Sequence, residues 1–339
     1  MQVSIIGLGL IGASMGQALR AKHGDKITVV GYDSNQDVHN AAVKIGAVDR
    51  AEWNLDVAVR DADTVIVATP TNAVYDIFEA CAPHLKPGTL VVDTSSSKRA
   101  VIDWAEDLLP GTVDFVGIDP LAGAGFRGQK DAHYNLFQGK RVALTPTVRT
   151  RESAVKATVK LIEDLGARAV FMDVDEHDSF SAAVNGLPLV AAACLLTVVS
   201  TSPSWREISR FVDTNFQSVT EPASIDPALG HAMAVTNPEM MVHWIDELIG
   251  VLTRVRNGIA DENTRYNTDS PLAEVFINAW EQRLRLENGI EPGGPAENSI
   301  PTSGEMTMSI LLGRIGQQLM SRTREKSKDP TKYDRRKMR

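Results

Sequence analysis

The chain begins with a short apolar segment that runs directly into a glycine-rich turn, and this feature constrains the fold most strongly. Residues 2–6 are too continuously apolar to alternate between two faces, so they predict a buried strand of a parallel sheet. Gly7, Gly9 and Gly12 follow in the spacing G-x-G-x-x-G. In that spacing the glycines permit a tight turn, close approach of a pyrophosphate and close packing of the next helix. The cofactor-binding residues predicted at this turn are Gly7, Leu8, Gly9, Leu10, Ile11 and Gly12.

An acidic residue ends the second apolar segment. Residues 27–32 predict a second strand, and Asp33 follows it at the distance from the glycines that dinucleotide-binding folds use. A carboxylate at this position accepts hydrogen bonds from the ribose hydroxyls of NAD and repels the 2′-phosphate of NADP. We therefore predict NAD as the cofactor. A role for Asp33 as a helix N-cap is the alternative. The glycines would also suit a flavin, but no second flavin signal is present.

Strand and helix patterns alternate through the first half of the chain, which predicts a parallel sheet covered on both faces. The fold class is therefore an α/β, doubly wound (Rossmann) domain over residues 1–172. Strands are expected at 2–6, 27–32, 63–68, 88–93, 113–118, 141–145 and 168–172. Helices are expected at 11–22, 36–45, 54–60, 73–83, 98–107 and 151–165.

Beyond residue 173 the strand signals disappear, and residues 173–288 predict an all-α domain. Helices are expected at 175–200, 205–215, 226–257 and 270–288. Residues 186–199 are wholly apolar, so that helix should be buried on all sides. Such a helix suits a dimer interface, and we expect a homodimer. Residues 289–339 read as a linker, a short helix near 305–321 and a basic tail.

Composition limits the partners and the compartment. The net charge of −8 argues against nucleic-acid binding by the body of the protein, and the basic tail reads as a solvated end. The longest apolar stretch, residues 186–199, is too short to span a bilayer, so no membrane association is expected. The first strand leaves no room for a signal peptide, and the two cysteines lack motif spacing, which favours a cytoplasmic protein. No metal-ligand spacing occurs, so no metal is predicted.

Several short motifs, in their order along the chain, resemble those of the prephenate/arogenate dehydrogenase family. They are GLGLIGAS at 7–14, ATPT at 68–71, DTSSSK at 93–98, LFQG at 136–139, LTP at 144–146, the pair His177–Asp178, and Asp226–Pro227 with Asn237. The resemblance implies a nucleotide-binding domain followed by a helical dimerisation domain. It also implies oxidation of a ring C4 hydroxyl by hydride transfer to NAD, with loss of CO₂, in the synthesis of tyrosine precursors. Thr69 and Pro70 would then lie beside the nicotinamide.

The chain departs from this family at the residues that carry the chemistry. Residues 117–123 read GIDPLAG where the family has GGHPMAG, so Asp119 stands in place of the proton-accepting histidine. Residues 185–189 read NGLPL where the family has SHLPH, and Glu221 stands where an arginine binds a substrate carboxylate. Histidine suits proton transfer at neutral pH, whereas a carboxylate is a weaker base unless burial raises its pKa. Glutamate in place of arginine reverses the charge at the anchor.

Three functions remain open on these residues. The chain is an NAD-dependent dehydrogenase of prephenate or arogenate, a dehydrogenase of a less anionic hydroxyl compound, or an NAD-binding homologue without catalysis. The predicted catalytic residues are Ser96, Asp119 and Lys98, and Ser96 is also predicted to bind the cofactor together with Thr69 and Pro70. The predicted substrate-binding residues are Asp119, Gly123, Arg127, Asn185, Glu221 and Asn237. Simpler roles compete with these: a turn at Asp119, a helix cap at Ser96, a solvent-facing Lys98, and His177–Asp178 as the start of the first long helix.

Overall fold

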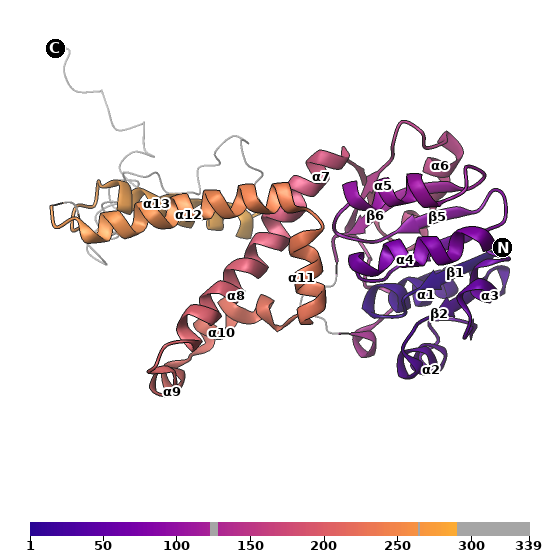
Figure 1. Ribbon diagram of the computed structural model, residues 1–339, viewed down its shortest axis with the longest axis horizontal. Helices are drawn as coiled ribbons and strands as arrows, with labels where there is room; N and C mark the ends of the chain where they lie inside the picture. Colours follow the sequence, from indigo (N-terminus) through magenta and orange to yellow (C-terminus); the bar gives the residue numbers. More distant parts are fainter. Residues whose placement is uncertain (123–127, 264, 290–339) are drawn as a thin grey trace, which may run out of the picture. The chain divides into compact units, whose positions relative to one another are not determined.

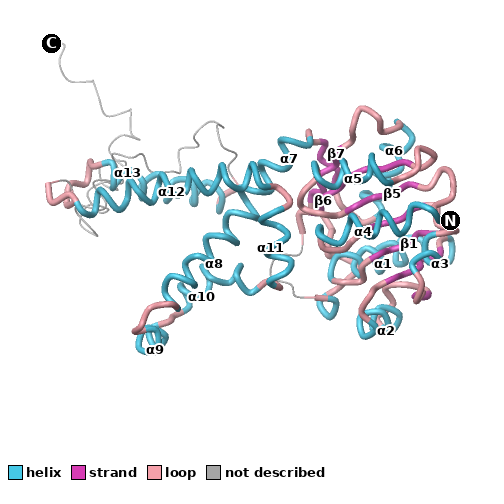
Figure 2. The backbone as a smooth tube through the Cα atoms, in the orientation of Figure 1, coloured by secondary structure: helices cyan, strands magenta, loops and turns pink. Residues whose placement is uncertain are grey.

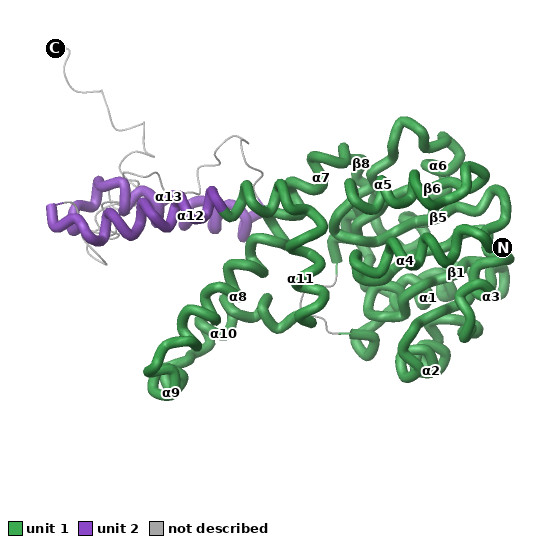
Figure 3. The backbone as a smooth tube through the Cα atoms, viewed as in Figure 1, with its two compact units in different colours: residues 1–245 green, residues 246–339 purple. Residues whose placement is uncertain are grey.

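The computed structural model describes residues 1–122, 128–263 and 265–289. The chain forms two compact units, Met1–Ile245 and Asp246–Arg339, which Figure 3 colours separately. The first unit holds the sheet and the first helices of the α-helical part.

An eight-stranded sheet forms the centre of the first unit, in the order β3-β2-β1-β4-β5-β6-β7-β8 (Figure 1). The strands are β1 (Gln2–Ile6), β2 (Thr28–Tyr32), β3 (Arg50–Ala51), β4 (Thr64–Val67), β5 (Leu90–Asp93), β6 (Asp114–Pro120), β7 (Arg141–Thr145) and β8 (Arg168–Phe171). β1 lies between β2 and β4 and is parallel to both. Successive strands are therefore added on one side of β1 and then on the other, and the strand order reverses beside the glycine turn. Ligands of open α/β sheets bind at such a switch point, outside the carboxyl ends of the strands.

Helices cover both faces of this sheet, as Figure 2 shows. They are α1 (Leu10–His23), α2 (Gln36–Lys44), α3 (Leu55–Val59), α4 (Thr71–Cys81), α5 (Arg99–Leu108) and α6 (Glu152–Asp164). One buried cluster includes Met15 of α1 and Ile162 of α6. A second cluster includes Phe78 of α4 and Val101 of α5. The predicted doubly wound α/β fold is therefore confirmed.

Two details of the sheet differ from the prediction. β6 and β7 are antiparallel, whereas all strands were expected to be parallel. The described residues between them form only the short 3₁₀ helix Gln129–Asp131, and without a helical crossover the chain returns directly. The prediction also missed β3, because two residues give no periodic pattern.

A long continuous helix opens the α-helical part. It comprises α7 (Val174–Ser181), a π-helical turn (Ala182–Gly186) and α8 (Leu187–Ser200). The elements α9 (Trp205–Ile208), α10 (Thr214–Thr220), α11 (Pro227–Val235) and α12 (Pro238–Ala260) follow. The helix expected at 205–215 ends early at Ile208. The helix expected at 226–257 is interrupted at Asn237, because the residue before a proline disfavours helical geometry.

The apolar helix α8 is largely exposed in the single chain. The prediction that it is buried on all sides is therefore wrong for the single chain. Leu189 and Ala192 are buried, but Val198 is 72% exposed. Continuity with α7 also removes the length argument against a membrane span. Residues 174–200 are long and apolar enough to cross a bilayer by length and composition, with 17% of the most apolar window buried. One such helix is weak evidence for a span, and the polar contacts of α7 described below are those of a packed protein helix.

The second unit contains the remainder of α12 and α13 (Pro271–Glu287). Gly258 of α12 lies against Leu272 of α13, and a Cβ at Gly258 would lie 2.9 Å from the Leu272 Cβ. Ser270 caps α13 by accepting a hydrogen bond from the Ala273 amide. The predicted short helix at 305–321 and the basic tail lie outside the described residues.

Candidate functional site

The glycine turn has the geometry that a dinucleotide pyrophosphate requires. Gly7 has a φ of +91°, and a Cβ there would lie 2.5 Å from the Ala68 carbonyl oxygen. A Cβ on Gly12 would lie 1.9 Å from the Gly7 carbonyl oxygen. Gly9, by contrast, faces open space, with no atom within 4 Å of its Cβ position. The first and third glycines therefore permit the turn and its packing, and the middle glycine leaves the backbone accessible to a phosphate at the start of α1.

Asp33 is fixed against this turn. One carboxylate oxygen accepts a hydrogen bond of 2.8 Å from the Leu8 amide, and the other accepts one of 2.8 Å from the Asn35 amide. The side chain that caps α2 is Asn35, which accepts from the Asp37 amide. Asp33 is therefore not the N-cap. It lies at the carboxyl end of β2 beside the phosphate turn, where a ribose hydroxyl would be held.

The residues expected beside the nicotinamide leave polar atoms for a cofactor to engage. Thr69 lies in the turn after β4, and Pro70 immediately precedes α4. Within the described chain, the Thr69 hydroxyl is buried without a hydrogen-bond partner, and the Thr69 side chain adjoins Gly7 of the glycine turn. Buried hydroxyls are normally hydrogen-bonded, so a partnerless hydroxyl beside an open phosphate turn fits a ligand with amide and hydroxyl groups. The residues present therefore fit NAD.

A fully buried ion pair lies beneath this edge of the sheet. The Lys98 ammonium contacts the Asp93 carboxylate at 2.7 Å, and both side chains are 0% exposed. Burial raises the pKa of Asp93, and the neighbouring Lys98 ammonium opposes that shift. Lys98 is thus neither exposed nor turned to solvent. Its ammonium holds the segment between β5 and α5, which contains Ser96.

Asp178 joins that segment to α7. Its carboxylate accepts hydrogen bonds from the backbone amides of Lys98 at 2.7 Å and Arg99 at 2.9 Å, so it caps α5 from a distant part of the chain. The amide of Asn237 donates to the Asp178 carbonyl oxygen at 2.7 Å. The Ser97 hydroxyl donates to the Thr236 carbonyl oxygen at 3.0 Å. These four contacts hold Ser96 between the sheet and the first helices of the α-helical part.

Asp119 meets a histidine at the end of β6. The His177 Nε2 lies 3.3 Å from the Asp119 Oδ2, and the His177 Nδ1 lies 2.9 Å from the Asp178 Oδ1. All three residues are buried, with exposed fractions of 7% or less. Burial lowers the pKa of His177, but hydrogen bonds to Asp119 and Asp178 outweigh burial and raise the pKa overall. The same imidazole and two backbone amides overcome burial and lower the pKa of Asp178.

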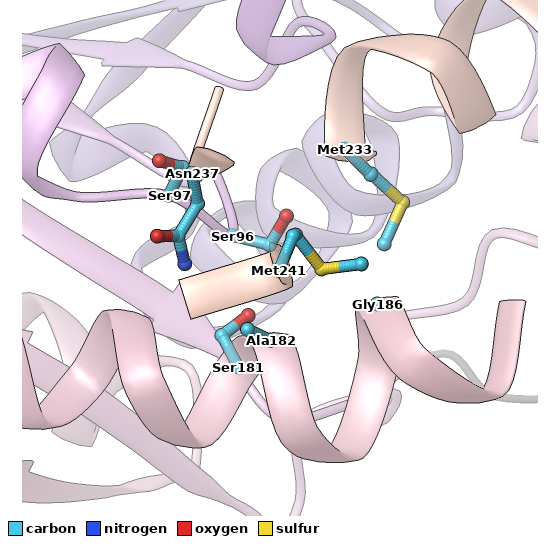
Figure 4. Close-up of a pocket in the computed structure, with 8 residues that line it drawn as sticks. All are labelled: Ser96, Ser97, Ser181, Ala182, Gly186, Met233, Asn237 and Met241. Carbon is cyan, nitrogen blue, oxygen red and sulfur yellow. The ribbon is translucent and has the colours of Figure 1, made fainter. Parts of the chain in front are cut away.

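A small pocket adjoins these contacts, and Ser96 and Asn237 both contribute to it (Figure 4). The complete lining is Ser96, Ser97, Ser181, Ala182, Gly186, Met233, Asn237 and Met241. Gly186 stands where the family has a histidine, and Met241 approaches that position: a Cβ on Gly186 would lie 2.4 Å from the Met241 sulfur. Methionine thus fills space at the histidine-free side of the pocket.

The remaining predicted substrate residues are less closely gathered. Asn185 lies in the π-helical turn, with its amide 3.5 Å from the Ser181 hydroxyl, and is otherwise exposed. Glu221 is exposed at the start of the 3₁₀ helix Glu221–Ser224. Gly123 and Arg127 lie outside the described residues. Over the part of the chain described, no three His, Cys, Asp or Glu side chains are placed to hold a metal ion.

Sequence reasoning did not identify the contact between Asp119 and His177. The two residues are 58 positions apart and belong to different parts of the fold, so no spacing rule links them. One signal was available. The chain lacks the family's loop histidine but keeps His177, so the pair His177–Asp178 was a place to look for a contact with residue 119.

Comparison with known proteins supplies the family. A model of the prephenate dehydrogenase nucleotide-binding domain matches residues 15–171, and a model of the prephenate dehydrogenase dimerization domain matches residues 173–274. The cyclohexadienyl dehydrogenase of Zymomonas mobilis is 32% identical over 287 residues, which cover 84% of this chain and 96% of that protein. The prephenate dehydrogenase of Bacillus subtilis is 30% identical over 263 residues, 77% of this chain and 71% of that protein.

Solved structures agree. Prephenate dehydrogenase from A. aeolicus in complex with hydroxyphenyl propionate and NAD⁺ is similar with a TM-score of 0.76 and 25% identity, over 84% of this chain and 98% of that one. Arogenate dehydrogenase from Synechocystis is similar with a TM-score of 0.68 and 25% identity, over 84% of this chain and all of that one. The glycine turn, Asp33 and these likenesses together make the protein an NAD-dependent oxidoreductase, and it belongs to the prephenate dehydrogenase family.

Proposed function

We propose that the protein oxidises the ring C4 hydroxyl of a cyclohexadienol of the prephenate and arogenate type, with loss of the ring carboxylate as CO₂. The observation that carries the proposal is the buried Asp119 at the carboxyl end of β6, in contact with His177 and on the same sheet edge as the NAD-binding turn. A proton acceptor beside a nicotinamide site is what dehydrogenation of an alcohol needs. The names of the relatives support this substrate class.

The residues divide the work as follows. When bound, NAD would supply the hydride acceptor for the substrate carbon. Residues 7–12 and Asp33 hold the dinucleotide, while Thr69 and Pro70 lie beside the nicotinamide. Ser96 and Asp119 face the reacting hydroxyl, and Lys98 supports them through its buried ion pair with Asp93. The substrate is bound by Asp119, Gly123, Arg127, Asn185, Glu221 and Asn237.

Glu221 favours arogenate over prephenate. Both compounds carry a ring carboxylate and a side-chain carboxylate, but arogenate also carries a side-chain ammonium, which an acid attracts, where prephenate has an uncharged ketone. Glu221 is exposed, so solvent screens this preference, and we expect roughly a 10-fold difference in kcat/KM rather than complete exclusion. The experiment is NADH formation by the purified protein with NAD and either compound.

Reversing the charge tests the assignment of Glu221. Glu221→Arg should lower the KM for prephenate and raise it for arogenate, while Glu239→Arg, an exposed acid at the start of α12, should leave the ratio unchanged. A ratio that does not move would remove Glu221 from the substrate site. Absence of turnover with both compounds, with NAD binding intact, would favour a less anionic hydroxyl substrate or a non-catalytic homologue.

The assembly follows from the α-helical part. We propose a cytoplasmic homodimer in which residues 1–172 bind NAD, residues 173–288 bind substrate and dimerise, and residues 289–339 form a linker, a short helix and a basic tail. The dimerization-domain match and the uncovered apolar face of α8 support the dimer. Val198→Asp places a charge on that face and should convert a dimer to a monomer in light scattering after size-exclusion chromatography. A wild-type protein that elutes as a monomer would contradict the proposal.

A further inference from the structure

We propose that His177 holds the proton that Asp119 takes from the substrate hydroxyl, so that the two side chains act together as the base. The inference rests on the proposed function, because it assumes a substrate hydroxyl at Asp119. In the family, a histidine in the loop at residues 117–123 accepts the substrate proton, but this chain has Asp119 there. The inference gives that role to His177 of α7, acting through Asp119. Asp119 contacts substrate in this arrangement, and His177 acts through Asp119.

The hydrogen bonds determine the orientation of the imidazole. Asp178 accepts from the amides of Lys98 and Arg99, and these donors together with the imidazole lower the pKa of its carboxyl. An ionised Asp178 accepts a hydrogen bond from a protonated Nδ1 of His177, at 2.9 Å. The other ring nitrogen, Nε2, is then directed at Asp119 Oδ2 at 3.3 Å. A carboxylate that fixes one nitrogen of an imidazole leaves the other nitrogen free to exchange a proton.

The charged groups around His177 come from four elements. Asp119 faces it from β6 and Asp178 lies beside it on α7. Lys98, before α5, opposes protonation of the imidazole, but its own charge is compensated by Asp93 of β5 at 2.7 Å. Arg99 of α5 is paired with Asp175 of α7. The imidazole thus lies between two carboxylates, while the charge of the nearby Lys98 is compensated by Asp93. This environment favours the protonated form of His177 beside Asp119.

The proton balance of the reaction is complete. As the C4 hydrogen leaves as hydride, the hydroxyl O–H bond breaks and its proton moves to Asp119 and on to His177 Nε2. The bond from the ring to the carboxylate then breaks, CO₂ departs, and the bond's electron pair enters the ring, which becomes a phenolate. The proton returns from the pair to the phenolate oxygen, so the pair ends the cycle as it began.

The pH dependence distinguishes this role from a structural one. Asp119 and His177 can accept the substrate proton only when His177 is deprotonated, so kcat/KM should rise with pH. The midpoint of this rise should lie above 6.5, the ordinary pKa of histidine, because hydrogen bonding raises the pKa of His177. His177→Gln keeps an amide donor toward Asp119 but cannot take up a proton. We expect kcat/KM to fall about 100-fold or more, and the acid limb that His177 sets above 6.5 to be lost from the pH profile.

Two controls keep the test decisive. His84→Gln, at an exposed histidine after α4, should leave rate and pH profile unchanged. His177→Asn keeps the contact with Asp178 and should show the same loss as His177→Gln, with thermal unfolding and NAD affinity reported for each variant. A His177→Gln enzyme with the wild-type pH profile and near wild-type rate would overturn the proposal.

A measurement that needs no substrate tests the pairing of His177 with Asp119 independently of the proposed function. The imidazole of His177 can be titrated by NMR in the wild-type protein and in Asp119→Asn, which removes one of the two carboxylates. The pKa of His177 should fall by about one unit or more in the variant. No change would overturn the pairing even in an active enzyme. Absence of turnover with prephenate and arogenate would instead overturn the proposed function, whatever the titration shows.

Discussion

Replacing Lys98 by methionine should expose how strongly the buried ion pair supports the site. The substitution removes the ammonium that lies 2.7 Å from Asp93, and both side chains are 0% exposed. Breaking a buried pair by removing one partner strands a charge in the interior and costs about 3–5 kcal/mol. For a unit of this size, 1 kcal/mol corresponds to about 2–4 °C in Tm, so we expect a fall of roughly 10 °C.

The loss should depend on pH in a definite direction. Burial already raises the pKa of Asp93, and removal of Lys98 raises it further. The unfolded chain releases this proton near its ordinary pKa of about 3.9, whereas the folded variant retains it to a higher pH. Stability is therefore lost as pH rises between the two values. Lys98→Met should be more destabilised at pH 8 than at pH 5, as measured by urea or thermal unfolding.

Two comparisons test the reasoning. The double variant Asp93→Asn/Lys98→Met removes both charges and should recover more than half of the lost free energy, because no charge remains stranded. Lys156→Met breaks a surface pair with Glu152 in which both side chains are more than 70% exposed, and should change stability by well under 1 kcal/mol. A double variant as unstable as Lys98→Met would refute the stranded-charge argument.

Three further substitutions test the NAD site and its support. Gly9→Ala should keep the wild-type Tm but weaken NAD binding at least 10-fold in calorimetry, because its Cβ position is open to the ligand and meets no protein atom. Gly12→Ala should lower the Tm by several degrees, since its Cβ would lie 1.9 Å from the Gly7 carbonyl oxygen. Asp33→Asn should weaken the affinity for NAD about 10-fold and reduce the preference for NAD over NADP. An unchanged ratio of the NAD and NADP affinities would contradict the ribose contact.

The nucleotide-binding half could be predicted from sequence because its signals are local. The strands over residues 2–6 and 27–32, the glycine spacing and Asp33 all lie within the first 33 residues, and each has a direct physical meaning. The antiparallel return of β7 could not be predicted, because the periodicity of a strand carries no direction. The uncovered face of α8 was predicted as buried, because periodicity does not distinguish burial within one chain from burial between two copies.

The candidate base depends on a long-range arrangement rather than on a motif. Asp178 caps α5 by accepting hydrogen bonds from two backbone amides. This contact holds α7 where His177, the residue before Asp178, meets β6. The same capping contact thus orients the imidazole and positions the segment that bears Ser96. A substitution at residue 119 can therefore change which group holds the proton without dismantling the site, since the imidazole is anchored from its other nitrogen. In the proposed mechanism, this arrangement lets a chain without the family's loop histidine present a histidine to the reacting hydroxyl through Asp119.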